Sequence, residues 1–206
     1  MSESTLEKAL RHTLKVEGEF VDHPADPGGA TKYGITQKTL SNWLGRKATK
    51  DDVRTMEWST AKEIYKANYW DKVRGSELPP ALAVLTFDVA VNSGIKNAVR
   101  NLQRALNIVG SGLVEDGLIG PATVRAAQNA AETQDTLESV IDEFVVKRGI
   151  FYSMLDTFGV FGLGWARRLV STARLAYAVA AEQFADAGDT SPEASARAVG
   201  LERLGR

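Results

Sequence analysis

The chain has 206 residues, of which 44% are hydrophobic and 25% charged, and its formal net charge is −1. This length allows one compact domain, or a domain that shares its core with a small subdomain. The balanced charge argues against nucleic acid or an anionic membrane as a partner, and the lack of cysteine excludes disulfides, a thiolate zinc site and a cysteine nucleophile.

Residues 1–8 lack the basic and apolar regions of a secretory signal. The apolar run closest to a membrane span, 169–185, is interrupted by Arg174 and Glu182. We therefore expect a chain that is made in the cytoplasm without a signal peptide and does not insert stably into a membrane. We also expect it to be a monomer.

Residues 5–17 are predicted to form a helix, because Leu6, Leu10 and Leu14 recur at a spacing of four. The same phase places Glu17 on the apolar face, and Gly18 is expected to end the helix. Prolines and glycines crowd residues 18–35, which predicts turns with room for at most a small β-hairpin.

The next segment is predicted to hold short helices. Thr36 can cap one that has Leu40, Trp43 and Leu44 on its inner face. Thr49 is followed three residues later by Asp52, the spacing of a capping box. Ser59 is expected to open a further helix that reaches about residues 69–70.

The second half is predicted to be helical throughout. Pro79-Pro80 precedes the most apolar helix, 81–91, which carries Asp88 and Asn92 on one side and ends at Ser93-Gly94. The remaining helices are expected at 96–107, 121–130, 135–157 and 165–186. Residues 187–206 are predicted to form a flexible tail. The fold class is therefore mainly α.

Glu17 and Asp26 suit the two carboxyl roles of a glycosidase, which needs a protonated acid beside the leaving oxygen and a group that positions water or stabilises positive charge. Burial and the negative end of the helix dipole are both expected to raise the pKa of Glu17. Asp26, in a polar loop, should stay ionised, and such a contrast between two carboxyls is typical of an acid and base pair. The Thr31 hydroxyl is a candidate to hold the attacking water.

A structural interpretation of the same residues stands beside this one. A glutamate near a helix end is common, and Asp26-Pro27-Gly28-Gly29 can be a turn in which the aspartate bonds its own backbone. Spacing alone favours this structural interpretation.

The stretch resembles the start of the glycoside hydrolase 108 family, which comprises phage-type and bacterial N-acetylmuramidases. The matching motifs are Glu17-Gly18-Glu19-Phe20, Asp26-Pro27-Gly28-Gly29, Thr31 and Gly34-Ile35-Thr36. The resemblance implies that Glu17 is the general acid, and the similar order in phage lysozymes implies catalytic roles for Asp26 and Thr31. Glu19 departs from the family motif, which has glycine there.

Further matches extend the resemblance over most of the chain. They are Tyr69-Trp70-Asp71, residues 85–94, Gly164-Trp165 with Arg168, and a small peptidoglycan-binding subdomain over 96–130 that contains Leu102-Gln103 and Asp116-Gly117. The resemblance implies a mainly α (α+β), lysozyme-like domain with a small β-hairpin after Glu17. It implies a catalytic region at 1–94, the peptidoglycan-binding subdomain with the helices packed on it at 95–186, and the tail at 187–206.

Four further residues are candidate substrate contacts: Tyr33, Trp70, Asp88 and Asn92. Each has a structural alternative. Asp88 and Asn92 can form a buried hydrogen-bond network, and Trp70 can belong to the core. For Tyr33, a position lining the cleft and a purely structural position are equally favoured. Arg168 is expected to brace the fold through an ion pair. With two histidines and no cysteine, we expect no metal site and no cofactor.

We therefore interpret the chain as a peptidoglycan hydrolase that cleaves the β-1,4 bond after N-acetylmuramic acid, by the inverting route. Its partner is peptidoglycan, which it would meet in the periplasm after release, as a phage endolysin or a bacterial enzyme. One alternative is a lytic transglycosylase that uses the single glutamate and no water. The other is a catalytically weak wall-binding or secretion-assisting protein, an alternative that Glu19 keeps open.

Overall fold

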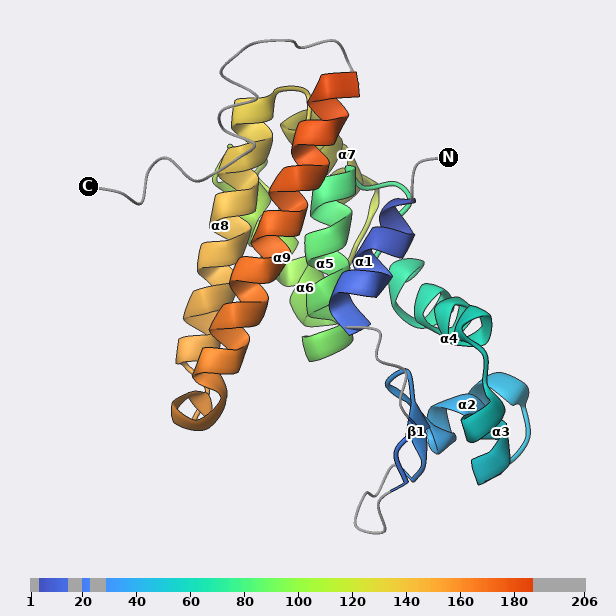
Figure 1. The fold of residues 1–206 in the computed structure, drawn as a ribbon. Coiled ribbons are helices and arrows are strands. Elements are labelled where there is room, and N and C mark those ends of the chain that lie inside the picture. Colours follow the sequence, from blue (N-terminus) through green and yellow to red (C-terminus); the bar gives the residue numbers. More distant parts are fainter. Residues whose placement is uncertain (1–3, 15–19, 23–28, 187–206) are drawn as a thin grey trace. The chain divides into compact units, whose positions relative to one another are not determined.

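The computed structural model describes residues 4–14, 20–22 and 29–186. Within these residues the chain is mainly helical with one two-stranded sheet, which confirms the predicted fold class. The chain divides into two compact units, Met1–Asp71 and Lys72–Arg206 (Figure 1), and each is considered by itself. No helix of the described residues is long and apolar enough to cross a membrane.

The first unit contains short elements. They are α1 (Thr5–Leu14), β1 (Thr31–Lys32), β2 (Ile35–Thr36), α2 (Gln37–Leu44), α3 (Lys50–Thr55), α4 (Trp58–Tyr65) and the π-helical segment η1 (Lys66–Trp70). Leu10 of α1 is fully buried, as its spacing predicts, and Lys62 of α4 pairs with Glu7 of α1 at 2.6 Å. The predicted continuation of α1 to residue 17 lies outside the described residues.

Local capping starts α2 and α3 as predicted. Thr36 Oγ1 accepts a hydrogen bond from the backbone N–H of Thr39 at 3.2 Å, and Thr49 and Asp52 form the complete capping box of α3. Trp43 and Leu44, expected on the inner face of α2, are instead 40% and 41% exposed. The prediction was wrong for these two, because β2 and α3, the main partners of α2 among the described elements, leave both side chains exposed.

The helix predicted from Ser59 to about residue 70 is α-helical only as far as Tyr65. The backbone N–H of Asp71 then donates to the carbonyl of Lys66 at 2.9 Å, an i to i+5 hydrogen bond typical of a π-helix. The wider turn brings residues five apart onto one face. Tyr65 and Trp70 are accordingly both buried, at 5% and 3% exposure.

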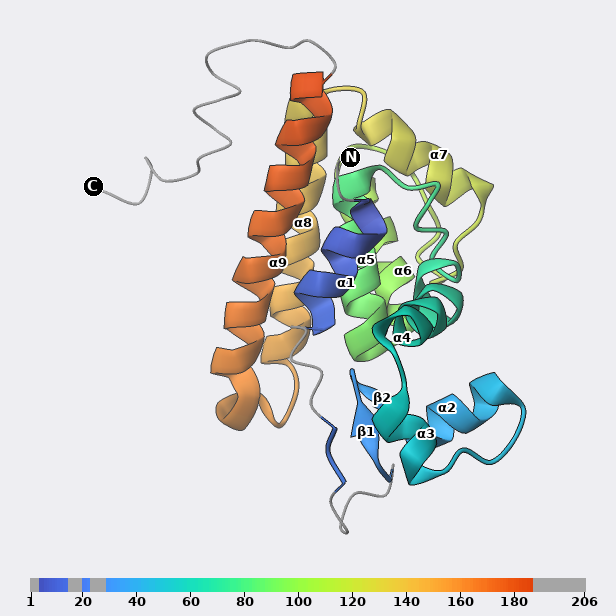
Figure 2. The same cartoon turned by 45° about the vertical axis from the view of Figure 1, so that its right-hand side comes forward.

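The second unit is a bundle of the helices α5 (Pro80–Ser93), α6 (Ile95–Asn107), α7 (Pro121–Ala130), α8 (Gln134–Ser153) and α9 (Phe158–Asp186). Figure 1 and Figure 2 both show α8 and α9 side by side, and α5 packs against α6 and α9. Every residue of α5 from Ala81 to Ala90 is buried, which explains its almost continuous apolar sequence.

The helix α9 starts at Phe158 and not near residue 165 as predicted. Glycines at 159, 162 and 164 lower helix propensity and led to the later predicted start. The rings of Phe158 and Phe161 contact the Trp165 ring of the same helix, at 6.4 and 5.9 Å between centroids, and these contacts support the early turns. A Cβ at Gly162 would lie 2.9 Å from the Phe158 ring, so this glycine leaves space for an aromatic side chain one turn earlier.

Candidate functional site

The β-hairpin of the first unit carries two of the predicted site residues, Thr31 and Tyr33. Thr31 pairs with Thr36 and Lys32 pairs with Ile35, so Tyr33-Gly34 forms a two-residue turn. Both turn residues have positive φ, 53° and 74°. This is the backbone of a type I′ turn, which glycine adopts freely and tyrosine rarely.

Neighbouring aromatic residues support the unusual conformation of Tyr33. The Tyr65 hydroxyl donates to the Tyr33 carbonyl at 3.2 Å, and the half-buried Tyr33 ring packs edge-on against Trp58 at 5.4 Å between centroids. Burial, with Tyr69 nearby, raises the pKa of Tyr65 to about 12. Tyr65 therefore remains a protonated donor at neutral pH.

Thr31 is half-buried, and its backbone is fixed on both sides. Its N–H and C=O exchange hydrogen bonds of 2.8 Å with Val21, and its hydroxyl donates to the Gly29 carbonyl at 3.3 Å. Lys32 anchors the same strand, because its ammonium donates to the carbonyls of Arg54 and Met56 at 2.7 and 2.8 Å. The hairpin thus holds the Thr31 hydroxyl in a defined position.

The two predicted catalytic carboxylates, Glu17 and Asp26, lie outside the described residues, as does Glu19. Their separation, which the inverting route requires to be roughly 6.5 to 9.5 Å, stays a prediction. Among the seven predicted site residues, the described part of the chain brings Thr31 and Tyr33 together on one hairpin.

Asp88 and Asn92 lie on α5 in the second unit. Asp88 is 4% exposed, and its carboxylate accepts hydrogen bonds from Arg168 of α9, the shortest at 2.6 Å. Asn92 is exposed, and its side-chain amide donates to the Asp88 carbonyl at 2.6 Å. The ion pair expected for Arg168 is therefore present, and these contacts favour the bracing interpretation of Asp88.

Trp70 is 3% exposed in the first unit. A ring this deeply buried has no free face on which a sugar can stack. Its position agrees with the core alternative and does not support its assignment as a substrate contact.

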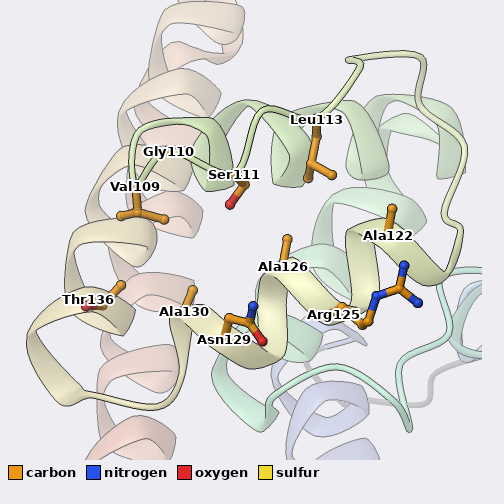
Figure 3. Close-up of a pocket in the computed structure, with 10 residues that line it drawn as sticks. All are labelled: Val109, Gly110, Ser111, Leu113, Ala122, Arg125, Ala126, Asn129, Ala130 and Thr136. Atoms are coloured by element: carbon orange, nitrogen blue, oxygen red, sulfur yellow. The ribbon is translucent and has the colours of Figure 1, made fainter.

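Two cavities of the second unit that bear on ligand binding were not predicted from the sequence. One, of about 460 Å³, lies between α7 and the loop before it, with Arg125 and Asn129 beside a row of alanines (Figure 3). The other, of about 190 Å³, lies between α6 and α8 and includes Arg148. The buried position of Arg148 beside the second cavity could have been predicted, because Arg148 lies on the same face of α8 as the buried residues Ile141 and Phe144.

Comparisons with known proteins identify the family. The glycosyl hydrolase 108 profile matches residues 10–94, and a profile described as a predicted peptidoglycan domain matches residues 97–170. A solved structure described as Brucella abortus SagA is 39% identical and aligns with a TM-score of 0.68, covering 85% of this chain and 95% of that one. No curated protein matches the chain. The chain therefore belongs to the glycosyl hydrolase 108 family, and its glycosidase region is followed by a peptidoglycan-binding domain.

Proposed function

We propose that this peptidoglycan hydrolase is an N-acetylmuramidase, and that it hydrolyses the β-1,4 bond after N-acetylmuramic acid with Glu17 as the general acid. The observation that carries the proposal is the family match over residues 10–94, which includes Glu17, Asp26 and Thr31. The peptidoglycan domain that follows supports the same polymer as substrate.

In the proposed reaction, Glu17 protonates the leaving oxygen while Asp26 and Thr31 hold the attacking water on the opposite face of the sugar. Thr31 suits this role because its hydroxyl donates its one proton to the Gly29 carbonyl. The oxygen of that hydroxyl can then only accept a hydrogen bond from water. Such a bond leaves a lone pair of the water free to attack the anomeric carbon.

Glu17→Gln tests the general acid. We expect this variant to clear chloroform-permeabilised Gram-negative cells at least about 10²-fold more slowly, because the amide cannot supply the proton. Glu19→Gln is the matched control, since it removes the neighbouring carboxylate and should keep most of the activity. Circular dichroism melting of each variant checks the fold. Clearing by Glu17→Gln at a rate close to that of the unmodified chain would overturn the assignment.

Product analysis separates this function from its rivals. Borohydride reduction of the released muropeptides should yield muramitol ends, which mass spectrometry detects. Anhydro-muramyl ends would instead indicate a lytic transglycosylase, and reduced N-acetylglucosamine ends would indicate cleavage of the other glycan bond. A protein that only binds the wall would sediment with it and release neither product.

A further inference from the structure

The smaller cavity of the second unit is rich in arginine. It has a volume of about 190 Å³ and is lined by α6 and α8 through Asn97, Arg100, Asn101, Arg104, Arg148 and Phe151. This volume is below the roughly 300–1,000 Å³ of pockets that hold drug-sized ligands. The cavity therefore suits a single residue or functional group and not a run of sugars.

Arg148 is a buried cation with no counter-charge in the part of the chain that the structure describes. It is 3% exposed, and no carboxylate of the described residues pairs with it. Its guanidinium donates to the Ser93 hydroxyl and lies over the rings of Phe151 and Tyr152, at 4.8 and 4.2 Å from their centroids. Its Nε finds no hydrogen-bond acceptor among the described residues. Aromatic faces offset part of the cost of burying a charge, but an anion offsets more.

Arg100 adds a second guanidinium, which forms no ion pair with the described residues, although its charge helps to lower the pKa of the Asp116 carboxyl. It donates to two backbone carbonyls, those of Glu115 at 3.0 Å and Asp116 at 3.5 Å. Arg104, by contrast, forms an ion pair with the Glu115 carboxylate at 2.9 Å. The cavity thus carries an excess of positive charge and presents forked N–H donors, which match a carboxylate.

Two asparagine side chains add acceptors beside these donors. The amide nitrogens of Asn97 and Asn101 donate to the carbonyls of Ser93 and Phe144, at 2.8 and 3.0 Å. Their amide oxygens accept no hydrogen bond from the described residues and can take one from an N–H group. A peptide end offers both a carboxylate and an N–H, whereas inorganic phosphate has no N–H.

We propose that this cavity binds a carboxylate-bearing residue of the peptidoglycan stem peptide. All six lining residues lie within residues 97–170, the part matched by the predicted peptidoglycan domain. The choice of this ligand rests on the proposed function, since the cell wall supplies the peptide. The cavity would then hold the enzyme on the wall through the peptide while the glycosidase region acts on the glycan.

Titration calorimetry of the full chain with the tripeptide L-Ala-γ-D-Glu-meso-diaminopimelate tests the proposal. The tripeptide has no glycosidic bond, so its binding does not depend on whether Glu17 catalyses hydrolysis. We expect Arg100→Gln and Arg148→Lys each to weaken binding by about tenfold or more, because each removes a forked donor while Arg148→Lys keeps the buried charge. A tripeptide with all carboxylates amidated should not bind.

Arg125→Gln is the matched control. Arg125 is exposed on α7, lines the larger cavity and makes no hydrogen bond or ion pair with the described residues. Its removal should leave tripeptide binding unchanged. Equal binding by all variants, loss of binding only in Arg125→Gln, or equal binding of the amidated peptide would each overturn the proposal. Binding of inorganic phosphate without binding of the tripeptide would also overturn it. Thermal melting shows whether each variant is folded.

Discussion

The Tyr65 hydroxyl supports the turn of the site hairpin. It donates to the Tyr33 carbonyl at 3.2 Å and occupies the space into which a Cβ at Gly34 would project, 2.5 Å away. One buried oxygen therefore determines both the conformation of Tyr33 and the requirement for glycine at position 34.

The pKa of Tyr65 predicts a loss of stability at alkaline pH. Burial, with Tyr69 nearby, raises this pKa to about 12, whereas an unfolded tyrosine titrates near pH 10. The contribution of the group to stability is thus complete below about pH 10 and is lost as the pH rises to about 12. We expect the free energy of unfolding to fall by about 2 kcal/mol more in the unmodified chain than in Tyr65→Phe over this range. Urea unfolding at a series of pH values measures this, and parallel curves for the two proteins would contradict it.

Gly34→Ala should destabilise the first unit by about 1–3 kcal/mol, because alanine is strained at positive φ and its Cβ meets the Tyr65 hydroxyl. Adding Tyr65→Phe removes the clashing oxygen and should recover part of the loss. Chemical denaturation of the two single variants and the double variant forms a thermodynamic cycle. Strictly additive effects would show that the hydroxyl is not the obstacle.

Single-residue predictions succeeded where the cause was local in sequence. Thr36 and Thr49 cap helices through atoms three residues away, so spacing is enough to find them. Trp43 was misplaced, because its exposure depends on which elements cover the end of α2. The positive φ of Tyr33 could not be predicted from the sequence either, because tyrosine seldom occupies such a turn.

At the scale of an element, the loop between α6 and α7 is organised by one buried side chain. Gln103 is 2% exposed, and its amide oxygen accepts from the Gly117 N–H at 2.8 Å. Its amide nitrogen donates to the Asp116 carboxylate at 2.8 Å, which lowers the pKa of Asp116 together with the Leu118 N–H. Gly117 has φ 75°, and a Cβ there would lie 2.6 Å from the Lys96 carbonyl. These contacts explain the Asp116-Gly117 motif.

We expect Gln103→Leu to lower the free energy of unfolding by about 1–3 kcal/mol, because it leaves the buried Gly117 N–H without its acceptor. Amide exchange at Gly117 should accelerate, and NMR measures this directly. The control is Gln128→Leu, which removes one exposed hydrogen bond to the Glu77 carbonyl and should cost less than about 0.5 kcal/mol. Equal losses in the two variants would contradict the role given to Gln103.

Helix positions were predictable from apolar spacing, with the exceptions of α9 and the end of α4. Val99, Leu102 and Leu106 are all fully buried, as their register predicts. Apolar spacing did not predict the start of α9 or the π-helical turn after Tyr65, because it records neither the ring contacts around Trp165 nor a change in the number of residues per turn.

At the scale of the whole chain, the Asp88–Arg168 pair joins helices that are 80 residues apart in sequence. Asp88→Asn replaces the buried carboxylate that pairs with the largely buried Arg168 guanidinium and should destabilise the second unit by about 3–5 kcal/mol. Asp71→Asn breaks the exposed Lys66–Asp71 pair and should cost under about 1 kcal/mol. Thermal and urea unfolding compare the two, and a similar small effect in both would argue against Asp88 as a brace.

Family resemblance contributed what physical patterns in the sequence could not. Periodicity and turn residues predicted the mainly helical fold with its hairpin, but the substrate followed from the family motifs. The boundary at residue 94 stays a prediction, whereas the compact units divide between Asp71 and Lys72. Such units depend on contacts between distant helices, which spacing along the chain does not record.

Because η1 is π-helical, the turn before Asp71 contains one residue more than a regular α-helical turn would need. Removing one residue, for example Ala67, would let the segment close as a regular α-helix. Tyr65 and Trp70 would then be four residues apart, the spacing at which α-helical side chains share a face. Trp70 should therefore stay in the interior, and far-ultraviolet circular dichroism and tryptophan fluorescence should barely change. The same deletion within a regular α-helix would turn every later residue by about 100°, so this segment should tolerate the loss of a residue better than its neighbours.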